Sequence, residues 1–387
     1  MENINFALMK NTNRFEVINR IYREDDVNRN YLTQNTGLTG AAVTKIINGL
    51  TADGFISEKA YYSDLRGRRA RYLSIRQNRY CVIVLYLNRD STTSTVTDIS
   101  GNFFFSQSFQ MNWKMFDEFA IQEIIREAAS HIPPQSTCIG VVCITPGIRS
   151  TDAQFVEKEA PYFWNIQKVR DLVQREFRLP FFTENDSNAA LLGEMWFGKG
   201  RDSNNVVLYN IGKGIGAAAF LHGVLLRGYH NSSIEIGHVS INFQGPVCAC
   251  GNRGCLELYT GLDNLKGKVE AFDTRYGTDD TIESIFVKAR GGNENCKKFV
   301  KEYASLIATG AVILAEMFSP EKIIITTNEA EFIDLTSIVD STKDAINTRI
   351  FSLGKQNIKI EASNLRKDGY ILGGISVAMQ NYFCIGS

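Results

Sequence analysis

The sequence Glu235–Ile236–Gly237–His238 is followed, after nine residues, by Cys248–Ala249–Cys250–Gly251–Asn252–Arg253–Gly254–Cys255–Leu256–Glu257. Three cysteines thus fall within eight residues, and a histidine lies ten positions before the first of them. Thiolates and a neutral imidazole are the ligands that tetrahedral zinc prefers, and the intervening glycines let the backbone turn tightly around an ion. The carboxylates of Glu235 and Glu257 flank the cluster, which favours a small-molecule site beside it. The pattern predicts a structural zinc ion (Zn2+) held by His238, Cys248, Cys250 and Cys255.

Two other interpretations of this cysteine cluster are open from the sequence. The thiols could form a disulfide, or they could be free and buried. Neither alternative explains the glycine spacing or the preceding histidine, so zinc is the favoured hypothesis. The other five of the eight cysteines are expected to be small buried hydrophobic residues in a reducing compartment.

Length and charge limit the possible architectures. A chain of 387 residues can form two or three domains, each with its own core. The 42 Lys and Arg residues balance the 42 Asp and Glu residues, so no global charge indicates nucleic acid or membrane. Residues 1–80 alone carry 13 basic and 8 acidic side chains. This asymmetry indicates a basic N-terminal module on an acidic body, and it favours a polyanionic partner.

Targeting signals are not expected in this chain. Met1–Lys10 lacks the basic flank and apolar core of a signal peptide. No uninterrupted apolar run has the length that crossing a bilayer requires. We therefore expect a cytoplasmic protein that has no membrane partner.

Three helices are predicted at the N-terminus, over residues 13–23, 31–36 and 40–52. Apolar residues recur at helical spacing in the first and third of them. Gly37 can supply a left-handed turn before the third helix, and Thr39 can cap that helix. The third helix should bury one apolar stripe and expose a face of small or polar groups able to approach bases and phosphates. With Thr39, that face comprises Ala41, Thr44, Lys45 and Asn48.

A basic hairpin is predicted directly after these helices. Two alternating strands, residues 55–59 and 70–75, are joined by a tip that contains Arg66, Arg68 and Arg69. Arginines at a hairpin tip suit contacts with phosphates or the minor groove. Three helices followed by such a hairpin indicate a winged helix-turn-helix DNA-binding domain over residues 1–78. Three-helix units of this kind also serve as dimerisation or protein-contact modules, and that alternative stays open.

The remaining chain is predicted to contain two similar halves. Residues 80–87 and residues 206–211 are apolar strands, and each is followed by a turn, a second strand and a glycine at nearly the same spacing. This pattern indicates a weak internal duplication in a layered α/β architecture. The predicted halves are residues 79–200, completed by a C-terminal helix, and residues 201–387 with the zinc site.

Several further motifs carry a resemblance over essentially the whole chain. They are Thr36–Gly37–Leu38–Thr39 with the Gly67–Arg68 wing, Thr145–Pro146–Gly147, Glu184–Asn185–Asp186 running into Ala189–Glu194, Gly212–Lys213–Gly214–Ile215–Gly216, and the Glu-x-Gly-His and cysteine motifs already quoted. With these motifs the sequence resembles the ROK family, which groups sugar-responsive repressors with sugar kinases. The resemblance implies an α/β fold of two actin-like (ribonuclease H-like) lobes behind the winged helix-turn-helix.

The resemblance also implies a site and partners. The ligand would be a sugar or sugar derivative in a cleft between the lobes, contacted by Pro146, Gly147, Asn185, Asp186, Glu235, His238 and Glu257. The zinc ligands would be the same His238, Cys248, Cys250 and Cys255, so that metal binding orients the histidine toward the sugar. Repressor members bind double-stranded operator DNA as homodimers or homotetramers. Without the resemblance, Asn185–Asp186 could be no more than a turn or a helix cap.

The turns at which kinases of this family would hold a nucleotide distinguish a transcriptional regulator from an enzyme. Kinases of the family carry an Asp-x-Gly-Gly-Thr turn after the first strand, where this chain has Leu87–Thr92 without any glycine. Side chains at those positions obstruct close approach of phosphate. The sequence therefore predicts a transcriptional regulator of the repressor type and no kinase activity. The alternatives are an ATP-dependent sugar kinase with Asp186 as general base, and a regulator whose effector is a partner protein.

Overall fold

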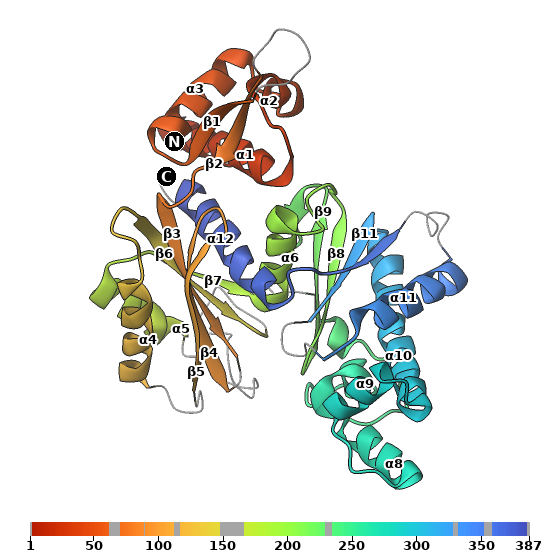
Figure 1. Cartoon of the computed structure of the whole chain (residues 1–387). Coiled ribbons are helices and arrows are strands. Elements are labelled where there is room, and N and C mark those ends of the chain that lie inside the picture. The colour runs from red at the N-terminus through yellow and green to blue at the C-terminus, as the bar shows by residue number, and fades with distance from the viewer. Residues whose placement is uncertain are drawn as a thin grey trace. The chain divides into compact units, whose positions relative to one another are not determined.

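The computed structural model describes residues 2–61, 70–88, 90–111, 117–147, 166–228, 234–327, 332–351 and 358–384 (Figure 1). The chain forms two compact units, one of residues 1–197 with 369–387 and one of residues 198–368. Within the described ranges, no helix combines the length and hydropathy that a bilayer-spanning segment requires.

The first unit begins with the predicted winged helix-turn-helix. Its elements are α1 (Glu2–Arg23), α2 (Arg29–Asn35), α3 (Gly40–Ala52) and the antiparallel strands β1 (Ile56–Tyr61) and β2 (Ala70–Ile75). Asn28 caps α2 by accepting a hydrogen bond from the Tyr31 amide at 3.0 Å. Thr39 caps α3 in the same way through Ala42. The first helix begins at Glu2, well before the predicted start at residue 13, because residues 2–12 contain no proline or glycine that would end a helix.

A five-stranded sheet forms the rest of the first unit's core. Its order is β5-β4-β3-β6-β7, antiparallel on the β5 side and parallel on the β7 side. The strands are β3 (Tyr80–Leu87), β4 (Ser91–Asp98), β5 (Phe103–Gln110), β6 (Thr137–Thr145) and β7 (Phe181–Asn185). The helices of this unit are α4 (Glu118–Ser130), α5 (Ile166–Leu172) continued by a π-helical turn (Val173–Phe177), α6 (Asp186–Phe197) and α12 (Lys367–Cys384).

The second unit repeats the same sheet order with different strands. Its order is β10-β9-β8-β11-β12, again two antiparallel pairings followed by two parallel ones. The strands are β8 (Val206–Ile211), β9 (Ile215–Leu221), β10 (Val224–Leu225), β11 (Lys322–Thr326) and β12 (Lys359–Ala362). The predicted internal duplication is therefore confirmed as two copies of one sheet topology.

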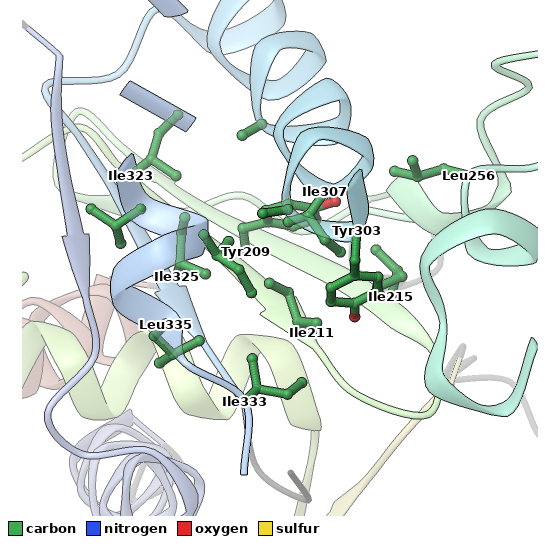
Figure 2. Close-up of a cluster of buried hydrophobic side chains, with 14 of the residues drawn as sticks. Tyr209, Ile211, Ile215, Leu256, Tyr303, Ile307, Ile323, Ile325, Ile333 and Leu335 are labelled. Carbon is green, nitrogen blue, oxygen red and sulfur yellow. The ribbon is translucent and has the colours of Figure 1, made fainter. Parts of the chain in front are cut away.

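The second unit's core lies between this sheet and its long helices. The helical elements are α7 (Glu257–Thr260), α8 (Lys266–Tyr276), α9 (Ile282–Arg290), α10 (Glu294–Phe318), α11 (Leu335–Arg349) and the 3-10 turns Ile236–His238 and Leu262–Asn264. Figure 2 shows Tyr209 and Ile211 of β8 and Ile325 of β11 gathered with Tyr303 and Ile307 of α10. All five side chains are buried. Leu256, which directly follows Cys255, belongs to the same core, so the cysteine cluster is attached to it through this residue.

Several elements differ from the sequence-based prediction. The helices α8 and α9 and the edge strand β5 were not predicted. Apolar and polar residues do not alternate regularly along β5. Three phenylalanines, Phe103–Phe105, are consecutive, and Phe103 is exposed. An edge strand of this kind gives a weak alternation signal.

Candidate functional site

The predicted zinc ligands form one cluster in the second unit. The ligand atoms of His238, Cys248, Cys250 and Cys255 all lie within 4.8 Å of one another. The Sγ atoms of Cys250 and Cys255 are 3.7 Å apart, and Sγ of Cys248 is 3.7 Å from Nδ1 of His238. The described cysteines are free thiols. A sulfur–sulfur bond measures about 2.05 Å, so the disulfide alternative is excluded for Cys250 and Cys255.

These separations fit a tetrahedral zinc ion. With Zn–S bonds of about 2.3 Å, two sulfur ligands at a tetrahedral angle lie about 3.8 Å apart, and a sulfur and a nitrogen ligand lie about 3.6 Å apart. The two observed distances of 3.7 Å agree with these values. The donor set of three thiols and one imidazole is that of structural zinc sites. The cluster is therefore suited to hold zinc.

The backbone around the cluster explains the spacing of its ligands. The Cys248 amide donates to the Asn252 carbonyl at 2.7 Å, and the Gly251 amide donates back to the Cys248 carbonyl at 2.9 Å, which closes a tight turn. Gly254 has φ of +62°, and a Cβ atom there would collide with the Asn242 carbonyl. Only glycine fits this close approach between two chain segments.

The thiols differ in acidity. A hydrogen bond from the backbone amide of Asn252 lowers the pKa of Cys250, which favours the thiolate that zinc binds. Burial raises the pKa of Cys255 to about 12, so this thiol is protonated when no cation is near. Metal binding at the cluster would therefore release protons.

A carboxylate lies close to the histidine of this cluster. Oε2 of Glu257 accepts a hydrogen bond from the Ile215 amide at 3.1 Å. The same oxygen would be 3.3 Å from a Cβ atom on Gly237, the residue directly before His238. The structure thus brings the predicted residues Glu235, His238 and Glu257 into one region of the second unit. The imidazole presents Nδ1 to the cysteines, which leaves Nε2 for another partner.

The other predicted sugar-binding residues gather in the first unit. The parallel strands β6 and β7 end side by side, with Thr145 paired to Asn185. Pro146 and Gly147 follow β6, and Asp186 follows β7 as the first residue of α6. The carboxyl ends of parallel strands are where open α/β sheets bind ligands. Nδ2 of Asn185 donates to the Gly147 carbonyl at 3.0 Å, which ties the two loops together.

Two residues that support Asn185 were not predicted. The buried Glu184 carboxylate accepts hydrogen bonds from the Asn185 amide at 2.9 Å and from Nδ2 of Asn188 at 3.1 Å. The Asn188 amide in turn donates to Oδ1 of Asn185 at 3.2 Å. A sequence signal existed, because Asn185 and Asn188 stand three residues apart across a helix start, which is the spacing of a capping interaction.

The predicted DNA-contacting face of α3 is exposed. Thr39, Ala41, Thr44, Lys45 and Asn48 are all exposed, while Val43, Ile47 and Leu50 are buried. This separation follows the predicted amphipathic pattern. The predicted wing residues Arg66, Arg68 and Arg69 lie outside the described residues.

Two turns of this chain correspond to the turns that would hold a nucleotide in a kinase of the family, and neither is suited to bind phosphate. The β3–β4 turn closes tightly, with the Asn88 amide donating to the Ser91 carbonyl at 2.8 Å. The β8–β9 turn contains Gly212 and Gly214, and Gly216 follows in β9, but the Ile215 amide already donates to Glu257. A carboxylate in that position repels phosphate.

Comparison with known proteins identifies relatives along the whole chain. The chain is 27% identical to the xylose repressor of Caldicellulosiruptor bescii, over 97% of this chain and 98% of the relative. It is 24% identical to the DNA-binding transcriptional dual regulator NagC of Escherichia coli K12, over 93% of this chain and 91% of NagC.

Solved structures share the fold. A ROK family transcriptional regulator, described as a homolog of the E. coli MLC protein, superposes with a TM-score of 0.78 at 23% identity, covering 98% of both chains. A ROK family glucokinase from Streptomyces griseus superposes with a TM-score of 0.64 at 21% identity, covering 78% of this chain and 99% of that one. The two-lobed α/β fold with an N-terminal winged helix-turn-helix is thus confirmed. The ROK family pattern itself matches residues 89–381, and the chain belongs to the ROK family.

Proposed function

We propose that this protein is a sugar-responsive transcriptional repressor, which leaves its operator when a sugar binds. The observation that carries the proposal is the presence, in one chain, of an exposed helix face suited to DNA and a set of polar side chains suited to a sugar. The relatives named as xylose and N-acetylglucosamine repressors align over the winged helix-turn-helix as well as the lobes.

The proposed effector is a sugar or sugar derivative held by the predicted sugar-binding residues. The Asp186 carboxylate would accept hydrogen bonds from sugar hydroxyl groups, and the Asn185 side chain would donate to and accept from them, supported by the loop at Pro146 and Gly147. Glu235, His238 and Glu257 would contribute from the second unit. Each sugar hydroxyl is both donor and acceptor, so carboxylates and an amide can bind pairs of them.

The proposed zinc ion is structural. It would be held by His238, Cys248, Cys250 and Cys255. Its role would be to fix the loop that carries the three cysteines and the position of the imidazole ring. With Nδ1 directed to the metal, Nε2 of His238 would carry the proton and donate to a sugar oxygen. Asn252 holds the backbone at His238, because its side chain donates to the His238 carbonyl at 3.2 Å.

Operator binding would use α3 as the recognition helix and the hairpin tip as a wing. Thr44, Lys45 and Asn48 would approach bases and phosphates, and Arg66, Arg68 and Arg69 would contact the backbone or the minor groove. Two copies in a homodimer, or a homotetramer built from dimers, would place two such helices on a pseudo-palindromic site.

Lys45→Ala is expected to weaken operator binding about equally across related sequences and to reduce the slope of log affinity against log salt by about one. The physical reason is the loss of one phosphate contact with its released counterion. Fluorescence anisotropy with labelled operator at several salt concentrations measures both effects. Lys266→Ala, which removes a lysine with an 86% exposed side chain in the second unit, is the matched control and should change neither. An unchanged salt slope in Lys45→Ala would contradict the proposed role of α3.

Kinase activity is not part of the proposal. The β3–β4 turn contains no glycine to admit a phosphate, and the Ile215 amide at the second turn is engaged by Glu257. A thermal-shift screen against sugars and sugar phosphates should identify the effector. With Mg-ATP and each sugar that binds, we expect phosphorylation at background level. Sustained turnover of a sugar would make the sugar-kinase alternative correct.

A further inference from the structure

The chain passes between the two units at only two places, and both involve helices of the first unit. The first crossing follows Phe197, the last residue of α6, and the second precedes Gly369, in the first turn of α12. Any rearrangement of one unit against the other must therefore act on the end of α6 and the start of α12.

These two helices are in direct backbone contact. A Cβ atom on Gly193 of α6 would collide with the Gly369 carbonyl, and one on Gly373 of α12 would collide with the Ala189 carbonyl. Helices that touch through glycine have no intervening side chains to absorb a displacement. In addition, every α6 residue from Ser187 to Trp196 is buried. We therefore expect the last turns of α6 and the first turns of α12 to move together.

The last turn of α6 carries a stacked aromatic pair with the DNA-binding domain. The ring of Trp196 lies parallel to that of Tyr22 on α1, with centroids 3.9 Å apart and planes 8° apart. Phe197 meets the same tyrosine edge-on at 5.5 Å. Nε1 of Trp196 also donates to Oδ1 of Asn19 on α1 at 2.8 Å.

Tyr22 is held at its hydroxyl as well as its ring. The hydroxyl donates to the Ile99 carbonyl in the β4–β5 turn. Burial, together with the nearby Asp98 carboxylate, raises the pKa of Tyr22 well above its ordinary value, so the hydroxyl stays a donor. Asp98 fixes this turn by accepting hydrogen bonds from the amides of Ser100 and Asn102, at 3.0 and 2.9 Å.

The opposite end of α6 begins at Asp186, directly after Asn185. A helix of 12 residues spans about 18 Å at 1.5 Å per residue. One buried helix thus connects the proposed sugar ligands at its first turn to Tyr22 at its last turn, next to a crossing between the units.

We propose that the Tyr22–Trp196 stack transmits sugar occupancy to the DNA-binding domain. The proposal rests on the function proposed above, since it needs a sugar that changes operator affinity. Sugar binding would shift the end of α6, and α1 would follow through the stacked rings and the Asn19 hydrogen bond. The bound and free states would then differ in the position of α1, and hence of α3.

A second contact joins the DNA-binding domain to the same lobe and offers a matched comparison. Phe55 stacks on Tyr80 at 4.2 Å and packs near Phe383 at 5.0 Å. Phe55 is 1% exposed and Tyr22 is 5% exposed, so both are buried aromatic residues. Phe55 touches the last turn of α12, far along the helix from the crossing at residue 369. It should stabilise the domain without transmitting the sugar signal.

The test compares Tyr22→Leu with Phe55→Leu in the full-length protein. For each protein, operator affinity is measured with and without the sugar found by thermal shift, and sugar affinity is measured with and without operator. In the wild type, the sugar should weaken operator binding by about 5- to 150-fold, and operator should weaken sugar binding by the same factor. Tyr22→Leu should reduce both factors below about 3-fold while leaving sugar affinity without DNA unchanged. Phe55→Leu should keep the wild-type factors although it lowers the melting temperature.

Each outcome decides the proposal. If Tyr22→Leu kept the wild-type coupling, the proposed role of the stack would be wrong, although the repressor function would stand. The same conclusion would follow if Phe55→Leu lost as much coupling as Tyr22→Leu. A wild-type protein whose operator affinity ignores every sugar that it binds would overturn the proposed function and this proposal together. Tyr22→Phe, which keeps the ring and loses the hydroxyl, should retain most of the coupling if stacking carries it.

A spectroscopic signal follows the stack directly. The chain has three tryptophans, and replacing Trp113 and Trp164 by Phe leaves Trp196 as the only one. Sugar should then change the emission of Trp196, and Tyr22→Leu should remove most of that change. No change in emission at saturating sugar would contradict a moving stack.

Discussion

Cys250→Ser is expected to lose bound zinc and to lower the melting temperature by about 8 to 16 °C. The metal would join two segments that are ten or more residues apart, and losing a metal is among the changes that destabilise by about 4 kcal/mol or more. In a unit of this size, 1 kcal/mol corresponds to about 2 to 4 °C. Zinc content per chain and calorimetric unfolding measure the two effects.

Cys296→Ala provides the control for this prediction. Cys296 is also in the second unit and is 2% exposed, but it lies on α10 outside the cluster. This variant should keep full zinc content and should lose only the stability that one buried side chain contributes, about 1 kcal/mol. If Cys250→Ser retained one zinc ion per chain and the wild-type melting temperature, the cluster would not be a structural metal site.

Asp186→Asn is expected to weaken sugar binding by about 10- to 150-fold and to leave operator binding without sugar unchanged. Hydrogen bonds to a charged group contribute about 1.5 to 3 kcal/mol, and the amide keeps the shape but loses the charge. Asn also preserves the start of α6, because Oδ1 can still accept from the Ser187 amide as in the wild type, at 2.6 Å. The variant should therefore stay on the operator at sugar concentrations that release the wild type.

Calorimetric titration with the sugar and anisotropy with the operator separate the two effects. Asp171→Asn, which changes an exposed carboxylate of the same unit, should behave like the wild type. Wild-type sugar affinity in Asp186→Asn would remove this residue from the site. Loss of operator binding without sugar would instead indicate that Asp186 supports the fold.

Sequence patterns predicted the parts of the molecule whose structure is determined by residues close together in the chain. The cysteine and histidine spacing predicted a cluster whose atoms the structure brings within 4.8 Å. The apolar runs at residues 80–87 and 206–211 predicted one strand of each sheet, because a strand that is buried on both faces has a nearly continuous apolar sequence. Thr39 marked the start of α3 through its capping side chain.

The parts that escaped prediction depend on contacts between distant segments. Glu184 lies between Thr183 and Asn185 like any strand residue, and its role in holding Asn188 follows from the geometry of the helix start. The stack of Tyr22 on Trp196 joins residues that are far apart in the chain. No local pattern predicts such a pair, since each aromatic residue alone indicates only burial.

The most direct test of the repressor proposal is operator binding at increasing sugar concentration. Operator DNA selected by the full-length protein is labelled, and anisotropy is followed while the sugar identified by thermal shift is added at constant salt. If the protein is a sugar-responsive repressor, operator affinity falls by about 5- to 150-fold with a midpoint near the sugar's own dissociation constant. Unchanged operator affinity at saturating sugar would contradict it.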